Sequence, residues 1–309
     1  MNRVTNMSSS KMLLNNINAK ARSLVGAQER IASGKQIQRP SDNPAQVLSA
    51  LDYRGQLRRN EQQERNSNDA RTWLDSADRA LTHTVERTER IRSLMLGALN
   101  ASSGHQARMA YAAEIDTIRE ELLQTSNTQH LSRPIFSGTE GVADAYDADG
   151  YYLGNAGVVE RNVADGVTIQ VNRSGPAVFG DEATPANPGD ALTTNELLDG
   201  NLFQVLTGIS EALRSGDMEA ASAGLTKLDA ATDRIEAAQV ELGARSRQVE
   251  EIGFRNLEIN VQLKAALAEV EDIDMAESLI EVQVQEMAYQ AALSVTGKVI
   301  QPTLLDFLR

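Results

Sequence analysis

The chain has 309 residues, enough for two or three domains of ordinary size, and it contains no cysteine, which excludes disulfide bonds and thiolate chemistry. Aromatic residues make up only 4% of it, which suits helices with aliphatic faces better than a bulky globular core. The net charge of −13 argues against nucleic-acid binding, which needs a basic surface. The charge is uneven, because residues 1–39 carry a net +6 and residues 261–309 a net −5. Opposite charges favour pairing of the two ends, although each exposed ion pair contributes little.

The first segment shows the three-and-four spacing of a coiled-coil helix. The seam positions are Met7, Ser10, Leu14, Ile17, Ala21, Leu24, Gln28 and Ile31. Gly34 follows the last apolar residue and predicts the end of this helix. Pro40 and Pro44 exclude a continuous helix through this region, so we expect a joint here, with Asn43 capping the next helix.

A second seam follows in a stretch without proline, with Trp73 beside it as a packing anchor. Its positions are Leu74, Ala77, Leu81, Thr84, Thr88, Ile91, Met95 and Ala98. After a break at 102–104, the pattern predicts a third helix over 106–124. The inward residues of this helix are Ala112, Ile115, Ile118 and Leu122.

Composition changes between 134 and 189, where four of the seven prolines and nine of the 21 glycines are found. Asp165-Gly166 is a hairpin turn signal, and the alternating segment 167–171 follows it. We therefore expect a small β-rich insert over 134–180 and a loop over 181–194. Helix is expected to resume near Asn195 and to break at Gly216-Asp217.

The longest periodic segment comes next and repeats every seven residues. Its main positions are Leu228, Ile235, Leu242, Val249, Leu263 and Val270, with Asn256 in the slot between. The alternate positions are Leu225, Thr232, Gln239, Ser246, Gly253, Asn260 and Leu267, and several of them are polar. Polar residues in a seam weaken it but fix its register.

The C-terminal segment predicts an amphipathic helix of about 25 residues. Steps of three and four place seven residues on one face: Ile273, Ala276, Ile280, Val284, Met287, Ala291 and Val295. Asp274 with Glu277 resembles a capping box, and Gly297 and Pro302 lie where the helix is expected to stop. So narrow a stripe cannot be buried alone, so it needs partner helices from this chain or from other chains.

These patterns together predict a mainly α protein: a long helical rod with coiled-coil-like paired N- and C-terminal helices and a small β-rich insert domain. The expected domains are a terminal helical domain (1–40 with 270–309), a rod domain (41–133 with 195–269) and the insert domain (134–194). The apolar terminal seams are the candidate protein-interaction residues. An apolar heptad is most often an intramolecular core, but these two seams are narrow, oppositely charged and flank a self-sufficient middle, which favours contacts between chains.

No residue set predicts catalysis, a cofactor or a metal site. The three histidines, His83, His105 and His130, have no shared metal-ligand spacing, so we expect the protein not to be an enzyme. No apolar run approaches 18 residues, and the first ten residues contain no apolar core of a secretory signal. Export, if it occurs, is expected to use a route without signal cleavage.

Two segments carry a family resemblance. Residues 27–37 (AQERIASGKQI) resemble the flagellin-superfamily segment that ends the first helix, and residues 270–277 (VEDIDMAE) are similar to its acidic turn before the last helix. Within the superfamily, 40–44 (PSDNP) and 305–309 (LDFLR) resemble hook-filament junction proteins more than filament flagellins.

The resemblance implies a structural subunit secreted to the bacterial flagellum at the cell surface. The partners that it implies are further copies of the chain in a ring or helical assembly, another hook-associated protein on the hook side, flagellin on the filament side, an export chaperone and the type III export apparatus. It implies neither nucleic-acid binding nor membrane insertion. Two alternatives remain open at this point: a filament flagellin and a cytoplasmic coiled-coil adaptor.

Overall fold

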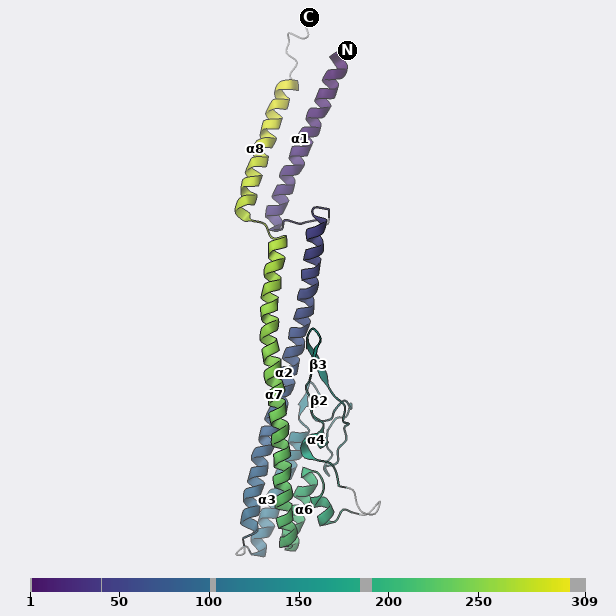
Figure 1. Ribbon diagram of the computed structural model, residues 1–309, viewed down its shortest axis with the longest axis vertical. Helices are drawn as coiled ribbons and strands as arrows, with labels where there is room; N and C mark the ends of the chain where they lie inside the picture. Colours follow the sequence, from purple (N-terminus) through teal and green to yellow (C-terminus); the bar gives the residue numbers. More distant parts are fainter. Residues whose placement is uncertain (1, 40, 101–103, 184–190, 301–309) are drawn as a thin grey trace. The chain divides into compact units, whose positions relative to one another are not determined.

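The computed structural model describes the backbone of residues 2–39, 41–100, 104–183 and 191–300, with side chains from 11 to 297 in these ranges. This part of the chain is mainly helical and confirms the predicted fold class (Figure 1). Its helices are α1 Asn2–Ser33, α2 Pro44–Ala98, α3 His105–Ser126, α4 Gly175–Phe179, α5 Thr194–Leu198, α6 Leu202–Ser215, α7 Met218–Glu271 and α8 Met275–Ile300. Its strands are β1 Gln129–His130, β2 Arg133–Pro134, β3 Glu160–Ala164 and β4 Val167–Gln170.

The chain divides into two compact units. Unit 1 consists of Met1–Arg59 with Ile259–Arg309, and unit 2 is the continuous stretch Asn60–Glu258. The helices α2 and α7 each contribute residues to both units. Unit 1 is therefore built from two distant parts of the sequence, whereas unit 2 is built from one.

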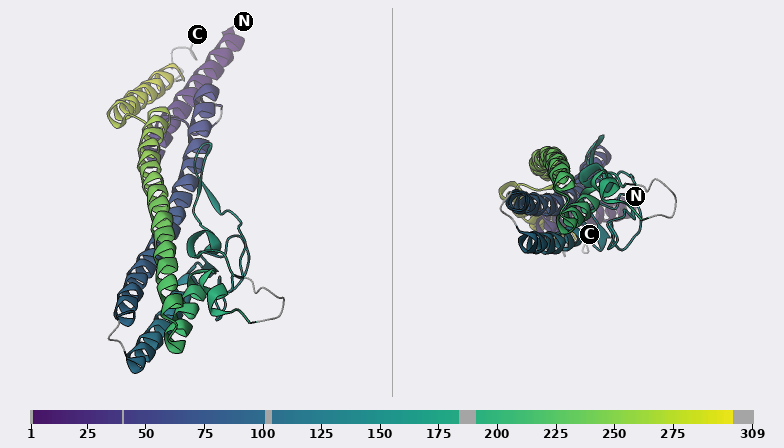
Figure 2. Two further views of the ribbon diagram at one scale, coloured as in Figure 1. Left: turned by 60° about the horizontal axis from the view of Figure 1, so that its bottom comes forward. Right: turned by 90° about the horizontal axis from the view of Figure 1, so that it is seen from below.

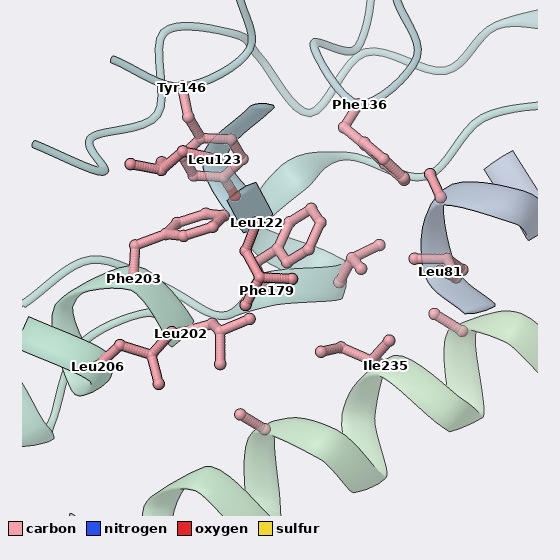
Figure 3. Packing of buried hydrophobic residues seen from close by; sticks show 14 of the residues in the cluster. Leu81, Leu122, Leu123, Phe136, Tyr146, Phe179, Leu202, Phe203, Leu206 and Ile235 are labelled. Atoms are coloured by element: carbon pink, nitrogen blue, oxygen red, sulfur yellow. The ribbon is translucent and has the colours of Figure 1, made fainter. Parts of the chain in front are cut away.

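Unit 2 contains the large hydrophobic core. Every residue of the second predicted seam is buried, as are Trp73 and the four inward residues predicted for α3. Four aromatic rings from the insert and from α6 continue this core (Figure 3): Phe136, Tyr146, Phe179 and Phe203. The Tyr146 and Phe203 rings lie 4.9 Å apart, within the range of favourable edge-to-face packing. Burial raises the pKa of the Tyr146 hydroxyl well above its ordinary value.

The seam of α7 confirms one predicted column of residues and corrects the other. The seventh-residue positions from Leu228 to Asn256 are buried as expected. Of the predicted alternate positions Asn260 is buried, but the main second column of buried residues lies three residues after the first and consists of Ala231, Ala238 and Ile252. The predicted Thr232 and Gln239 are only half-buried at the edge. The apolar column takes the inner place because its burial is favourable, and alanine lets helices approach closely.

The insert holds two antiparallel hairpins and the short helix α4, with β2 and β3 alongside α2 and α7 in Figure 1. The β3–β4 hairpin turns at the predicted Asp165-Gly166, where Gly166 has a φ of +72°. The β1–β2 hairpin is an addition to the expected elements, and it turns at Leu131-Ser132. Helix resumes at Thr194, and α6 ends at Gly216 in the left-handed conformation, as the sequence predicts.

The joint between α1 and α2 is present. Helix α1 ends before Gly34, whose φ is +68°, and α2 begins at Pro44. Asn43 caps α2, because its Oδ1 accepts a hydrogen bond from the Gln46 N–H at 3.3 Å. The expected stop at Gly297 is wrong, since α8 continues to Ile300; a helical glycine costs about 1 kcal/mol but does not end a helix. Pro302 and the 305–309 tail lie outside the described residues.

Candidate assembly interface

Helices α1 and α8 pack side by side within unit 1 (Figures 1 and 2). From α1, the predicted Ile17, Ala21, Leu24 and Ile31 are half-buried, and Ala27 is fully buried. Leu14 is exposed, and the side chain of Met7 lies outside the described residues. The α1 seam therefore supplies much of the surface that is shielded in the single chain.

The shielded face of α8 differs from the predicted stripe. It consists of residues spaced three and four apart: Val282, Gln285, Tyr289, Ala292 and Thr296. Sequence reasoning missed this face because glutamine, threonine and alanine give little hydropathy signal. The regular spacing was the only signal that could have found it.

The predicted stripe lies on another face of α8 and is open to solvent. Ile273 is half-buried, and the other six members are exposed: Ala276, Ile280, Val284, Met287, Ala291 and Val295. Ile280 and Met287 are 62% and 61% exposed, respectively. An apolar stripe over several helical turns that the chain itself leaves uncovered is typical of a protein-interaction surface.

Ion pairs join the two oppositely charged ends of the chain. Arg30 Nη2 of α1 lies 2.6 Å from Glu281 Oε1 of α8, and Lys35 Nζ lies 2.6 Å from Asp272 Oδ1. The hydrogen bond to Asp272 raises the pKa of the Lys35 amine. These pairs agree with the charge pattern of the sequence, although each is exposed enough to contribute little.

One buried carboxylate, that of Glu271, lies between the end of α7 and the segment that follows α1. The Glu271 side chain is only 5% exposed and lies 2.8 Å from Arg54 Nη2 and 3.3 Å from Lys35 Nζ. Beside it, the Gln36 N–H donates to the Glu271 carbonyl at 2.7 Å, and the Ile273 N–H donates to the Gly34 carbonyl. Lys35 and the two backbone bonds thus tie the end of α7 to the segment after α1, and Arg54 ties it to α2. The acidic segment 270–277 was the sequence signal for this site, but it did not single out Glu271.

Helix α8 then starts from a side-chain cap. Asp274 Oδ1 accepts hydrogen bonds from the backbone N–H of Ala276 at 2.8 Å and of Glu277 at 3.2 Å. The cap satisfies donors that would otherwise lack partners in the first turn. It confirms that the helix start was read correctly from the sequence.

These polar side chains join structural elements, and the described residues form packing surfaces rather than a catalytic or metal-binding site. They contain no group of three potential metal-ligating side chains. His83 contacts Thr125 and Arg87, and His130 contacts Asp69, so both rings serve to join elements of unit 2. Nor does any helix in this part of the chain have the length and apolar content that crossing a bilayer requires.

Comparisons with known proteins agree with this architecture. The model of the bacterial flagellin N-terminal helical region matches residues 4–140, and that of the flagellin C-terminal helical region matches residues 225–308. Flagellin of Bacillus subtilis (strain 168) is 24% identical over 287 residues, covering 91% of each chain.

Similar folds are found among solved structures. A proposed flagellar hook-associated protein of Vibrio parahaemolyticus superposes with a TM-score of 0.64 at 19% identity, covering 75% of this chain and all of that one. FlgL of Bacillus cereus gives a TM-score of 0.58 at 23% identity, covering 70% of this chain and 99% of its own. With both flagellin regions matched in order, and with a terminal helix pair and a small strand-containing region between them, the chain belongs to the flagellin superfamily of flagellar structural subunits.

Proposed function

We propose that the chain forms the junction between hook and filament and that it self-associates through its terminal helices in a ring or helical array. The terminal domain, 1–40 with 270–309, makes these contacts, while the rod (41–133 with 195–269) and the insert (134–194) surround them. Its neighbours are another hook-associated protein and flagellin. It reaches the cell exterior through the type III export apparatus, accompanied by a chaperone.

The observation that carries this proposal is the exposed stripe of α8. Full burial of one large aliphatic side chain is worth about 1.5–3 kcal/mol, so several such side chains on one face are a substantial driving force once a partner covers them. The residues concerned are Ile280, Val284, Met287 and Val295. Because every copy carries the same stripe, the contribution recurs at each subunit of an assembly.

The junction role is supported by the fold neighbours. The flagellar junction protein FlgL of Legionella pneumophila superposes with a TM-score of 0.56 and is covered completely. The sequence relatives favour a second candidate, filament flagellin, because the Bacillus subtilis match is itself a flagellin and extends over nearly the whole chain. Polymerisation separates the two roles: purified flagellin is expected to grow long filaments from seeds or in high salt, whereas a junction subunit is expected to stop at short assemblies.

The test of the assembly surface is Ile280→Asp. The thermal melt of the purified monomer is expected to stay unchanged because the side chain is exposed there. Filaments are expected to be lost from cells that carry only the variant, because a buried unpaired carboxylate adds its desolvation penalty to the lost apolar contact.

Gln290→Asp is the matched control, since it adds the same charge to an exposed position of the same helix outside the stripe. Filaments are expected to persist with this control. A large drop in the melting temperature of the Ile280→Asp monomer would instead make the stripe an intramolecular core and remove the main support for the proposal. A chain retained in the cytoplasm would favour the adaptor alternative.

A further inference from the structure

Two short non-helical segments connect the α1–α8 pair to the rest of unit 1. The chain leaves α1 through residues 34–43 before α2 begins, and it leaves α7 through residues 272–274 before α8 begins (Figure 1). Both segments belong to unit 1. Segments of this kind can absorb changes in backbone dihedral angles, so the direction of the pair depends on the contacts that hold them.

The segment after α1 is folded on itself. The Asp42 carboxylate accepts hydrogen bonds from the backbone N–H of Gln38 at 3.2 Å and of Arg39 at 2.8 Å. These bonds, above all the one from Arg39, lower the pKa of the Asp42 carboxyl. Gln38 Nε2 also donates to Ser33 Oγ at 3.0 Å. Because the segment has a defined shape, the direction of the pair is set by whatever attaches this segment to α2 and α7.

Apolar packing contributes little to this attachment. A cavity of about 260 Å³ lies between the segment and the first turns of α2. Ile37 and Arg39 line it from the segment, and Val47 and Leu51 line it from α2. Leu51 is also 55% exposed. Side chains separated by a space of this size are not close-packed, so van der Waals contacts do not fix the segment against α2.

Backbone hydrogen bonds attach the segment only over a short length. The Gln36 N–H donates to the Glu271 carbonyl at 2.7 Å, and the Ile273 N–H donates to the Gly34 carbonyl at 3.3 Å. Together they frame one isolated antiparallel bridge. A ladder of this length is too short to be stable alone, since even a complete two-stranded hairpin is only marginally stable in water.

The Glu271 carboxylate, at the last residue of α7, is a further attachment. Arg54 Nη2 of α2 lies 2.8 Å from Oε1 and 2.9 Å from Oε2, and Lys35 Nζ lies 3.3 Å from Oε2. The Glu271 side chain is 5% exposed, so these two cations compensate a charge that water hardly reaches. Separating a buried carboxylate from its partners is strongly unfavourable, whereas the half-exposed pair of Lys35 with Asp272 contributes little. The Glu271 contacts therefore resist rotation at the joint most.

We propose that Glu271 acts as a latch at this joint: while it binds Lys35 and Arg54, it fixes the direction of the α1–α8 pair relative to α2 and α7. When the carboxylate or both cations are removed, the pair turns at segments 34–43 and 272–274 while its helices remain intact. The latch thus determines the direction in which the unassembled chain presents the exposed stripe of α8. The proposal rests on the fold of the single chain and does not depend on whether the subunit belongs to the junction or to the filament.

A distance measurement between two spin labels tests the latch, because the chain has no cysteine that would compete for labelling. Full-length chain carries Ser23→Cys on α1 and Ser49→Cys on α2, both exposed positions, and pulsed electron paramagnetic resonance gives the distribution of distances between the labels. A narrow distribution is expected while Glu271 is present. Glu271→Gln keeps the size of the side chain but removes its charge, so the distribution is expected to broaden at least about twofold.

Circular dichroism on the same samples separates turning from unfolding. The helical content is expected to stay unchanged in Glu271→Gln, because α1 and α8 keep their own contacts, among them the ion pair of Arg30 with Glu281. A loss of helical content together with the broader distribution would mean that Glu271 stabilises the pair itself, and the proposal would be wrong.

Two further variants show whether the ionic contacts are responsible. Lys35→Gln with Arg54→Gln removes both cations and is expected to broaden the distribution as Glu271→Gln does. Glu269→Gln is the matched control, since it removes the same charge from an exposed position of α7 two residues earlier. The distribution is expected to stay narrow with this control.

The distance distributions can also reject the latch. A narrow distribution in Glu271→Gln, or in the variant without both cations, would show that the backbone bonds fix the joint without the carboxylate. Equal broadening in Glu269→Gln would show that any change at the end of α7 loosens it. A broad distribution with Glu271 present would show that the pair has no fixed direction in the monomer.

Discussion

Asp69 is a single residue that holds three segments of unit 2 together. One carboxylate oxygen accepts a hydrogen bond from Arg161 Nε of β3 at 2.6 Å, and the other lies 3.3 Å from His130 of β1. Burial alone would raise the pKa of the Asp69 carboxyl, but the hydrogen bonds from Arg161 and His130 outweigh burial and lower it. Both hairpins are therefore attached to α2 through one charged group.

The lowered pKa of Asp69 gives a pH-dependent prediction. Since the folded pKa lies below the unfolded value of about 3.9, the contribution of Asp69 to stability is present above about pH 4 and is lost as pH falls through the folded pKa. Asp69→Asn should thus destabilise the protein at pH 7 and much less at pH 2.5, as measured by urea unfolding at both values. Asp75→Asn, at a more exposed position of the same helix, is the control and should change little at either pH. An Asp69→Asn deficit of equal size at both pH values would contradict this account.

At the scale of the helix, Asn256 interrupts the apolar seam of α7 and attaches the insert to it. The side-chain Nδ2 donates to the Val163 carbonyl of β3 at 2.8 Å, and the Asn256 carbonyl accepts from Asn60 Nδ2 of α2, also at 2.8 Å. The residue is almost fully buried. A buried amide whose partners must be matched specifies the register of these three elements.

Asn256→Ala should lower the free energy of unfolding by about 1–3 kcal/mol, because the Val163 carbonyl loses its donor while remaining shielded from water. Denaturant titration followed by circular dichroism measures this change. Val240→Ala on an exposed face of the same helix should stay within about 0.5 kcal/mol of the native chain. A similar small effect of Asn256→Ala would mean that water replaces the lost donor.

The elements that the sequence predicted well are those with long apolar periodicity. The α2 seam and the inner face of α3 are confirmed residue by residue, because each inward position is apolar or a threonine at regular spacing. Two features could not be predicted because their residues lack the hydropathy or turn signal on which such predictions depend. The shielded face of α8 contains Gln285 and Thr296, and the β1–β2 turn uses Leu131-Ser132 where glycine or asparagine is typical. The role of the terminal seams in contacts between subunits stays a prediction.

Considered as a whole, the molecule has two units with very different cores. Among the described side chains, the buried apolar residues of unit 1 are Ala27, Ala50 and Leu57. Unit 2 has a continuous cluster of leucine, isoleucine, valine and aromatic side chains from its helices and hairpins. Local stability follows the apolar area buried, so the terminal pair is the more easily opened part.

Hydrogen exchange on the soluble monomer should show this difference. Amides of α1 and α8 should exchange fast, whereas those of α3 and of the middle of α7 should be protected by several orders of magnitude. In assembled flagella the terminal amides should become protected as well. Protection of α1 and α8 in a proven monomer equal to that of α3 would show that the pair is stable alone and does not depend on assembly.

The pairing of α1 with α8 joins the two ends of the sequence, and this sets an order for folding during synthesis. The contact between Arg30 and Glu281 closes a separation of 251 residues. At about 5–20 residues per second, a ribosome completes α8 roughly 12–50 s after α1, so the first helix waits without its partner for most of translation. Unit 2 becomes complete first and brings Asn60 and Asn256 together, which shortens the loop that the ends still have to close. The newly made chain therefore folds from the interior of its sequence outward, and its two ends pair only after the last helix has been made.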